Sequence, residues 1–492
     1  MAAPNATLTV RENGLNLQPP STAGRHVKMG ASSQGTVGTL YEFNTYDQVR
    51  STIGYGPLAD AVVFALGELT QGVAPAPVLA MRATASTAAT SGSVTPTRTS
   101  TSTGTVATTG STPYDSYSVQ LVVVQTGALG AGTFKYSLDG GAHFSPEIVI
   151  PSGGTYAIPN TGITAVFTAG AGPIIFEAGD LFAWTTVEPK CTTTNLNSAW
   201  TSLLADPRTW GFAHVVGVAA DQTDLASRWD AMSTNVNNAA VQRRHVRCFI
   251  EGPTGVSDAT LIAAMAIKQN SRMVVSADVE DLTVPDTGNK FRRSVAWVQT
   301  ARVAAIPIHE DPARVKSGAV SSNNIALVRD ENITPGLDDA RFSTMRTWIK
   351  RSGLYITNVK LFSAAGSDLR YIQHGRVIDV ACDVTYFGLV NQASENFRVD
   401  PVPVTDPTTG LKYNRILEQD ARMIESEIQE LLNDALLRPG HVSDVKFALS
   451  RTDAVLTSET LTSSVSVVPL GYAKALVSTV SFVNPARLAT AA

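Results

Sequence analysis

The spacing of hydrophobic residues changes along this 492-residue chain, and the change separates segments that cannot share one kind of secondary structure. Between residues 117 and 186 apolar residues alternate with polar ones, as in "ITAVFT" and "LFAWTT", which predicts β-strands. From about residue 192 to 320, apolar runs such as "FAHVVGVA" alternate with helical windows, which is typical of a parallel sheet covered by helices. The chain also exceeds the roughly 250 to 300 residues of a single core, so we expect several domains.

An abrupt change in composition marks the boundary before the strand-rich segment. Twenty of the 36 residues from Ala83 to Ser118 are Ser or Thr, which is too little apolar mass for a core and predicts a linker, a long loop or an edge ladder. We therefore expect an inserted all-β domain with this Ser/Thr-rich linker over residues 83–190 and an α/β domain over residues 191–323. The expected fold class is α+β and α/β multidomain.

Helices and strands outside the β-rich segment are predicted from apolar spacing and cap residues. Apolar residues at helical spacing predict a helix in "PLADAVVFALGEL", residues 57–69, and Asp221 and Ser257 stand at N-cap positions in the α/β segment. In the last third, "YITNVKLF" and "VIDVACDVTYF" predict strands, and a long helix is expected from about residue 414 to 437.

The helix expected at 414–437 has an apolar seam in steps of three and four residues, and acidic residues cover the rest of its surface. Two interpretations stay open. The helix either packs on its own sheet as an ordinary surface helix or presents an acidic face to a partner. The acidic residues concerned are Glu418, Glu425, Glu427 and Glu430.

The charge balance excludes one class of partner and favours another. With 38 Lys and Arg against 42 Asp and Glu, the net charge of −4 gives no basic footprint for a phosphate backbone, so we expect no nucleic-acid partner. Charged residues make up only 16% of the chain, which suits a protein whose surface is largely covered by copies of itself. No apolar run is long enough to span a bilayer, and the start "MAAPNATLTV" lacks the pattern of a secretory signal.

Motifs that carry chemistry are weak. The seven histidines are never within four residues of one another, so no helix can present two of them to a metal. "HED" at residues 309–311 lacks convergent partners, "GALGAG" leads into a strand and not a helix, and "GPTG" at 252–255 is needed to turn the chain. The basic clusters "RRHVR" and "NKFRRS" are read as solvated faces or salt-bridge partners. We expect no enzyme activity, no metal and no cofactor.

Both chain ends contain strand patterns with no following element to hold them. A short alternating stretch lies near the start, and "KALVSTVSFVNP" at 474–485 alternates throughout. The two candidate strands comprise Thr7, Leu8, Thr9 and Val10, and Leu476, Val477, Ser478, Thr479, Val480, Ser481, Phe482 and Val483.

Three passages carry a resemblance to a known family. "TNVKLFSAAGSDLRYIQHGRVIDVACDVTYFGL", "VVPLGYAKALVSTVSFVNPA" and "GITAVFTAGAGPIIFEAGDLFAWTTVEP" resemble tail sheath proteins of phages with contractile tails. The resemblance rests on pattern and order over most of the chain. It implies an inner α+β sheath domain built from both chain ends, residues 31–82 and 324–492, behind an N-terminal arm of residues 1–30. The α/β and all-β domains would be inserted into it.

The family resemblance also implies a function. Sheath subunits form sixfold rings stacked helically around a tail tube, and the terminal arms of neighbouring subunits add strands to a subunit's own sheet. The two candidate terminal strands would be these arms, and the acidic helix would be the element that faces the tube. Implied partners are copies of the chain, the tail tube protein, and baseplate and tail terminator proteins. Contraction would drive the tube through the host envelope, from a virion assembled in the host cytoplasm.

The cysteines suggest one further hypothesis for a sheath subunit. Cys248 and Cys382 sit among apolar residues and are expected to be buried, whereas Cys191 lies in the polar junction "EPKCTTTN" and is expected to be exposed. Because virions leave a reducing cytosol, an exposed Cys191 could form an inter-subunit disulfide after release.

Two rival functions remain at this point. A β-rich adhesin or other virion component would also be Ser/Thr-rich, but it would be expected to show internal repeats, and none is found across the β-rich segment. An α/β enzyme with an appended β domain would need convergent titratable groups at strand ends, and only "HED" and "GPTG" are available.

Overall fold

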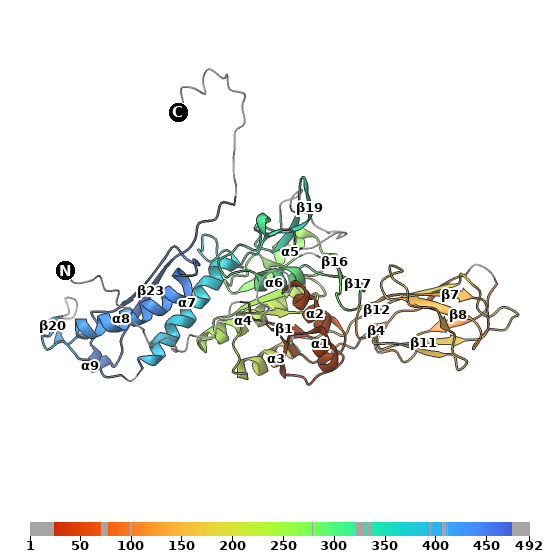
Figure 1. Cartoon of the computed structure of the whole chain (residues 1–492), viewed down its shortest axis with the longest axis horizontal. Coiled ribbons are helices and arrows are strands. Elements are labelled where there is room, and N and C mark those ends of the chain that lie inside the picture. The colour runs from red at the N-terminus through yellow and green to blue at the C-terminus, as the bar shows by residue number, and fades with distance from the viewer. Residues whose placement is uncertain are drawn as a thin grey trace, which may run out of the picture.

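The computed structural model describes residues 24–69, 77–98, 101–277, 279–320, 331, 336–393, 395–405, 410 and 412–474. Figure 1 shows an elongated molecule in which a helical body, a helix-covered sheet and a β domain lie in a row. The mixed helix and strand content expected from the sequence is confirmed.

A mostly parallel six-stranded sheet forms the middle of the molecule. Its spatial order is β15-β14-β13-β1-β3-β2, and only β2, at one edge, runs antiparallel to its neighbour. The parallel alternation expected for the α/β segment is thus confirmed for β13, β14 and β15. The strands are β1 (His26–Gly30), β2 (Leu40–Phe43), β3 (Val78–Arg82), β13 (Phe212–Val215), β14 (Arg247–Glu251) and β15 (Met273–Ser276).

Helices cover both faces of this sheet because its strands are apolar on both sides. Successive residues of one strand, such as Phe212 and Ala213, belong to different cores on the two faces. The expected helix at 57–69 is confirmed, and Asp221 and Ser257 do cap their helices. One face carries α1 (Tyr46–Ile53), α2 (Pro57–Leu69) and α6 (Ala296–Ala305), and the other carries α3 (Thr193–Ala205), α4 (Gln222–Val241) and α5 (Asp258–Met265).

The grouping of the N-terminal strands differs from the expectation. We assigned residues 31–82 to a domain with residues 324–492, but β1 pairs in parallel with β13, and β3 pairs with β1. Segments 26–82 and 212–276 therefore share one sheet and its two cores. The prediction was wrong on this point because sequence spacing does not reveal which distant strands pair.

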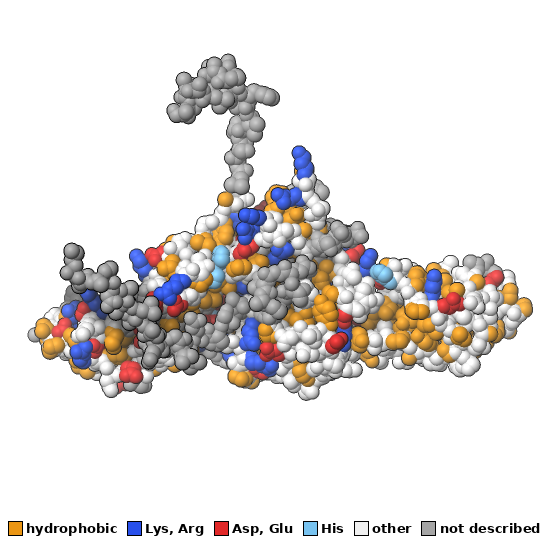
Figure 2. Space-filling view, viewed as in Figure 1, with side chains coloured by type: hydrophobic (Ala, Val, Ile, Leu, Met, Phe, Trp, Pro, Cys, Tyr) orange, Lys and Arg blue, Asp and Glu red, His pale blue; other side chains and the backbone are white. Residues whose placement is uncertain are grey.

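The β domain lies at the other end of the molecule and consists of two facing sheets. Buried aromatic rings join them: the Phe134 and Phe167 centroids are 5.0 Å apart. Figure 2 shows that its visible surface is mostly hydrophobic or uncharged polar. Its strands are β4 (Thr90–Ser91), β5 (Thr95–Thr97), β6 (Thr105–Ala107), β7 (Ser118–Gln125), β8 (Thr133–Ser137), β9 (Ile148–Val149), β10 (Thr155–Ile158), β11 (Ile163–Thr168) and β12 (Leu181–Val187).

Hairpins and one short turn complete the central and helical parts of the molecule. They are β16 (Val279–Thr283) with β17 (Lys290–Ser294), the 3-10 turn η2 (Val315–Ser317), β18 (Thr344–Trp348) with β19 (Arg351–Asn358), and β20 (Val404–Thr405) with β21 (Lys412–Tyr413). The helical body contains α7 (Ile372–Asn391), α8 (Glu418–Leu432), the π-helical turn η3 (Asn433–Leu437), β22 (Asp444–Leu449), the short α9 (Val455–Ser458) and β23 (Ser463–Val468).

The passage "VIDVACDVTYF" is helical, so the predicted strand there was wrong. It lies within α7, whose buried positions recur at helical spacing. One of them, Gly375, admits the guanidinium of Arg247, because a Cβ at this position would lie 2.2 Å from its Cζ. Arg247 is buried and pairs with Asp379 one turn further along, with 2.6 Å between Nε and Oδ2. Tertiary packing of this buried face therefore outweighs the strand preference of the Val, Ile and Thr residues.

The helix expected at 414–437 begins at Glu418 and passes into η3 at Asn433. Its apolar face is buried against α7 and β22, as the interpretation of a helix packed on its own sheet requires. The two helices approach closely at Gly388 of α7, where a Cβ would lie 3.0 Å from Ile428. None of the described helices is both long and apolar enough to cross a bilayer.

Candidate strand-pairing interface

The hairpin β22–β23 is a two-stranded sheet that depends on the helices beneath it. Two strands alone are marginal in water, and this pair is held by Val445, Phe447 and Leu449, which alternate along β22 and are buried against α8. On β23 only Val465 and Val467 are partly buried, and the other four residues are exposed. We did not predict either strand, although the alternation in "DVKFAL" and "SSVSVV" would have indicated both.

The register of the hairpin determines which peptide groups face outward. Ala448 lies opposite Ser464, and the amide of Ser450 donates to the carbonyl of Thr462 at 2.8 Å. In an antiparallel pair the residues alternate between bonding the partner and pointing away from it. The main-chain groups of Ser463, Val465 and Val467 therefore point to the outer edge of β23, and no strand among the described residues pairs with that edge.

A mostly apolar groove of about 600 Å³ lies beside this edge. Its floor is the surface of α7, where the side chains of Tyr386 and Val390 are 46% and 49% exposed. Val465 and Val467 of β23 form one wall, and Arg243 stands at the rim. The other lining residues are His245, Ile378, Ala381, Cys382, Thr385, Leu389 and Ala393.

The groove continues into a second hollow of about 290 Å³ on the other side of Tyr386 and Val390. Trp210 lines it, together with Arg208, Arg244 and the carboxylate of Asp383, so this end is aromatic and has more basic than acidic groups. An open strand edge, an apolar floor and a basic end together form a surface suited to an extended peptide, because main-chain bonds and side-chain pockets are available side by side.

The described chain is anchored where it leaves the hairpin. The hydroxyl of Tyr472 donates to the carbonyl of His309, and its ring packs on His374 with centroids 5.4 Å apart. The ammonium of Lys474 pairs with Asp311 and donates to Asn358 Oδ1 at 2.9 Å. "HED" is thus part of this anchor. Both predicted terminal strands, Thr7–Val10 and Leu476–Val483, lie outside the described residues.

The acidic residues of α8 are engaged with the chain's own side chains. Glu418 is exposed and accepts from Arg422 and Arg451, both at 2.7 Å, and these hydrogen bonds lower its pKa to about 2. Glu427 accepts from Gln392 at 2.8 Å, and Glu430 pairs with Arg438. Glu425 points to β22, where the amide of Leu449 donates to its carboxylate at 2.8 Å. Glu425 therefore does not belong to an outward acidic face.

Cys191 is buried, so the expected exposure was wrong. Burial raises the pKa of its thiol to about 11, which leaves no basis for a reactive inter-subunit thiol. Residues 188–191 cross the carboxyl ends of β1 and β13, where the strand order of the sheet reverses. Open α/β sheets commonly bind ligands at this point. Here the crossing segment leaves a cavity of only about 10 Å³, room for about one water.

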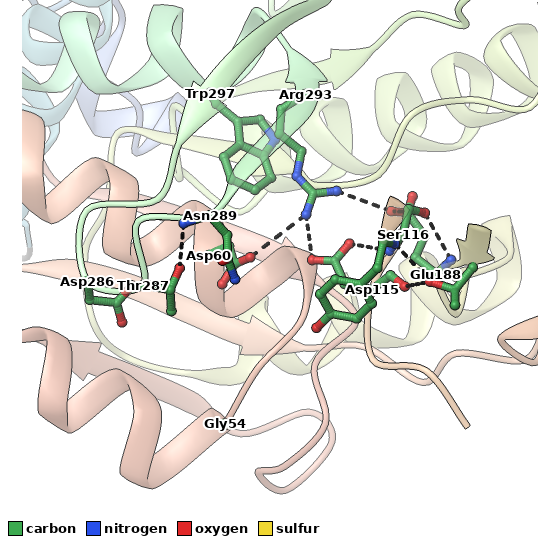
Figure 3. Close-up of polar contacts among 12 residues, drawn as sticks. Gly54, Asp60, Asp115, Ser116, Glu188, Asp286, Thr287, Asn289, Arg293 and Trp297 are labelled. Atoms are coloured by element: carbon green, nitrogen blue, oxygen red, sulfur yellow. Dashed lines mark hydrogen bonds and ion pairs between the residues drawn. The ribbon is translucent and has the colours of Figure 1, made fainter. Parts of the chain in front are cut away.

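A buried arginine attaches the β domain to the central sheet. Figure 3 shows Arg293 of β17 directed between Asp60 of α2 and two residues at the base of the β domain, Asp115 and Glu188. The guanidinium nitrogens lie 2.5 Å from Asp115 and 3.4 Å from Glu188, with Asp60 at 3.8 Å. Its Cζ stands 5.2 Å from the Trp297 ring centroid. The basic cluster "NKFRRS" therefore includes a buried salt-bridge partner between domains, as one of its two interpretations predicted.

Burial is the largest influence on the carboxylates of this cluster. It raises the pKa of Asp115 to about 6 and raises that of Glu188, while the adjacent Arg293 opposes both shifts. Among the described residues no three His, Cys, Asp or Glu side chains are placed to hold a metal ion.

Comparison with known proteins gives one family and a common fold. The sequence matches the family described as DUF2586, N-terminal domain, over residues 7–360. No curated protein matches it. A chain in the 6-fold symmetrised baseplate of the anti-feeding prophage aligns with 98% of this chain and 100% of its own, at 8% identity and a TM-score of 0.52.

Two contracted sheaths are similar to the same extent. The helical sheath of the anti-feeding prophage covers 98% of this chain and 99% of its own, and the sheath complex of an extracellular contractile injection system, PVC, covers 98% of each. Both align at 8% identity with a TM-score of 0.51, which shows a shared fold. The chain therefore belongs to the DUF2586 family, and its fold is that of contractile sheath proteins.

Proposed function

We propose that this protein is the subunit of a contractile sheath and that copies join by adding strands to the outer edge of β23. The observation that carries the proposal is the outer edge of β23, which no strand among the described residues pairs and which lies beside an apolar groove, in a chain with the fold of sheath proteins. Exposed strand edges are usually blocked in monomeric proteins, because they recruit other chains. An edge kept open next to an apolar groove favours use by a partner.

The incoming strand is a terminal segment of a second copy, residues 476–483. Its backbone bonds the outward peptide groups of Ser463, Val465 and Val467, and one of its two alternating faces fills the groove on α7. The anchor at Tyr472 and Lys474 holds the start of this arm, so the arm of each subunit leaves from a defined point. The N-terminal segment Thr7–Val10 is a second arm of the same kind.

Arms that pass from copy to copy build an open assembly. A head-to-tail contact that does not close on itself generates a helical filament, as a sheath around a tail tube requires. Rigid subunits can then change their packing while the arms keep them connected, which is how contraction would drive the tube through a host envelope. Further partners are the tube protein, the baseplate and the tail terminator, in a virion or a related injection particle. Because strands within residues 26–82 belong to the central sheet, we keep the proposal of an inner sheath domain only for residues 324–492.

The rival functions are weaker. The structural neighbours named above are sheath and baseplate assemblies, and the crevice where an α/β enzyme would bind a ligand is filled by residues 188–191. An adhesin has no specific observation in its favour.

The test is a chain that ends after Lys474, compared with the full chain by negative-stain microscopy and size-exclusion chromatography. We expect striated tubes from the full chain and a folded, soluble, unassembled subunit from the truncated one, because the three described hydrophobic cores consist of residues that precede Lys474. The matched control is a full-length chain in which Val480 and Phe482 are both changed to Asp. It keeps the length of the arm but removes two of its apolar side chains. Regular tubes from the truncated chain would refute strand addition by this arm.

A further inference from the structure

The two edges of the β22–β23 hairpin are not equivalent. The register that directs Ser463, Val465 and Val467 outward from β23 also directs the main-chain groups of Val445, Phe447 and Leu449 outward from β22. On β22, however, side chains of Gln429, Glu425 and Arg451 bond four of these groups.

Gln429 of α8 takes the place of a peptide group at this edge. Its Oε1 accepts from the amide of Phe447 at 2.8 Å, and its Nε2 donates to the carbonyl of Val445, also at 2.8 Å. One primary amide thus makes the two bonds that a strand in this position would make to the same residues. The side chain is only partly exposed, and Ile428 beside it is buried in the core that holds α8 in place.

Two residues further along the same edge, at Leu449, a charged pair makes similar bonds. The amide of Leu449 donates to Glu425 Oε1 at 2.8 Å, and the carbonyl of Leu449 accepts from Arg451 at 2.9 Å. Arg451 bonds both oxygens of Glu425, at 2.9 Å and 2.8 Å. Charge-assisted bonds of this kind are stronger than those between neutral groups.

We propose that α8 closes the β22 edge with these side chains and thereby confines strand addition to β23. The inference rests on the proposed function, since it concerns the same hairpin and the same partner, residues 476–483 of a second copy. A strand at β22 would have to break four side-chain to main-chain hydrogen bonds and displace α8, whereas no described strand pairs with the β23 edge beside the groove. A second arm can then only pair outside the first, so the sheet grows in one direction.

Cysteine cross-linking distinguishes the two edges. Ala448 and Ser464 are both exposed and lie directly opposite each other, one on β22 and the other on β23, so cysteines at the two positions are a matched pair. A strand added at β23 lies about 4.8 Å from the backbone of Ser464 and about twice that from Ala448, and a disulfide requires Cα atoms within about 7 Å. Each position is changed to Cys in turn, in combination with Cys at successive positions from 477 to 481 of the arm. The background carries Cys382→Ala, because Cys382 lines the groove.

The readout is the fraction of inter-subunit disulfide in oxidised tubes on non-reducing gels. We expect Ser464→Cys to cross-link at least tenfold more than Ala448→Cys at its best arm position. Equal or greater cross-linking at position 448, or no cross-linking at position 464 in well-formed tubes, would overturn the proposal that the β22 edge is closed. Failure of every variant and of the unmodified chain to form tubes would count against the proposed function instead.

A second variant tests the role of the glutamine itself. Gln429→Met keeps the length of the side chain and removes both bonds to β22. In the Ala448→Cys background it should raise cross-linking at 448 several-fold, and an unchanged fraction would overturn the role of Gln429. Thermal melting of the unassembled variant checks that the hairpin still folds.

Discussion

Replacing Arg293 by Met tests whether the buried charge cluster attaches the β domain to the central sheet. Methionine keeps the apolar stem against Trp297 but leaves Asp115 and Glu188 buried without their cation. Asp60 keeps Arg50, whose guanidinium lies 2.8 Å away, so the loss is concentrated on the two carboxylates at the base of the β domain. Removing one partner of a buried ion pair costs about 3 to 5 kcal/mol, which is the loss we expect.

The assay is urea unfolding followed by tryptophan fluorescence, because Trp297 lies in contact with the change. With a slope of a few kcal/mol per molar urea, the expected loss shifts the relevant midpoint down by about 1 to 2 M. Arg292→Met is the matched control. Arg292 is the adjacent residue, its side chain is 50% exposed, and its nearest acidic oxygen, on Asp281, is 4.0 Å away. We expect a change below about 0.5 kcal/mol for it.

The pH dependence of the Arg293→Met variant has a definite sign. Without the cation, burial raises the pKa of Asp115 and Glu188 further above their values in the unfolded chain. The folded variant then binds protons that the unfolded chain does not, so its stability rises as pH falls from 8 towards 5.5. The deficit relative to the unmodified protein should narrow over that range. Equal stability of the two Met variants, or a deficit that widens on acidification, would refute the reasoning.

Two further predictions concern α8. Arg451→Met should lower the melting temperature at pH 7 and flatten the decline of the melting temperature between pH 5 and 3. The reason is that the lowered pKa of Glu418 gives stability above about pH 4.3 that is lost on acidification. Melting temperatures of variant and unmodified protein that fall in parallel with pH would contradict this. Changing Glu427 and Glu430 to Lys should weaken co-sedimentation with the tube protein while leaving melting unchanged, if α8 presents its exposed face to the tube. Ser426→Lys on the same exposed face is the control, and unchanged tube binding by the double reversal would leave α8 with its packing role alone.

Elements with complete local signals were predictable from the sequence. The helix at 57–69 carries its own apolar spacing, and the caps Asp221 and Ser257 bond amides within three residues of themselves. The longer strands of the β domain, β7, β11 and β12, alternate with period two, and the alternation alone assigns them. In each case the residues that determine the element lie only a few positions apart in the sequence.

The candidate site was predictable only in part. The acidic helix was expected, but not that Glu425 and Gln429 bond the edge of β22, because those bonds join residues 18 and 24 positions apart through a fold. Cys191 was expected to be exposed because its neighbours are polar, and it is buried because residues 188–191 cross the end of the central sheet. The local sequence gives the polarity of a residue's neighbours in the chain, but it does not show which distant segment packs over that residue.

The sequence by itself determined the period of each segment, the β character of residues 117–186, the helices with their caps, and a charge balance without a nucleic-acid footprint. Only the tertiary structure decided that segments 26–82 and 212–276 share a sheet, that α7 is a helix built around Arg247 and Asp379, and that one edge of the hairpin is closed. The physical reason is the same throughout. Local propensities are worth about 1 kcal/mol per residue or less, whereas leaving a buried charge unpaired costs several times as much, and the pairing of charges and strands depends on residues far apart in the chain.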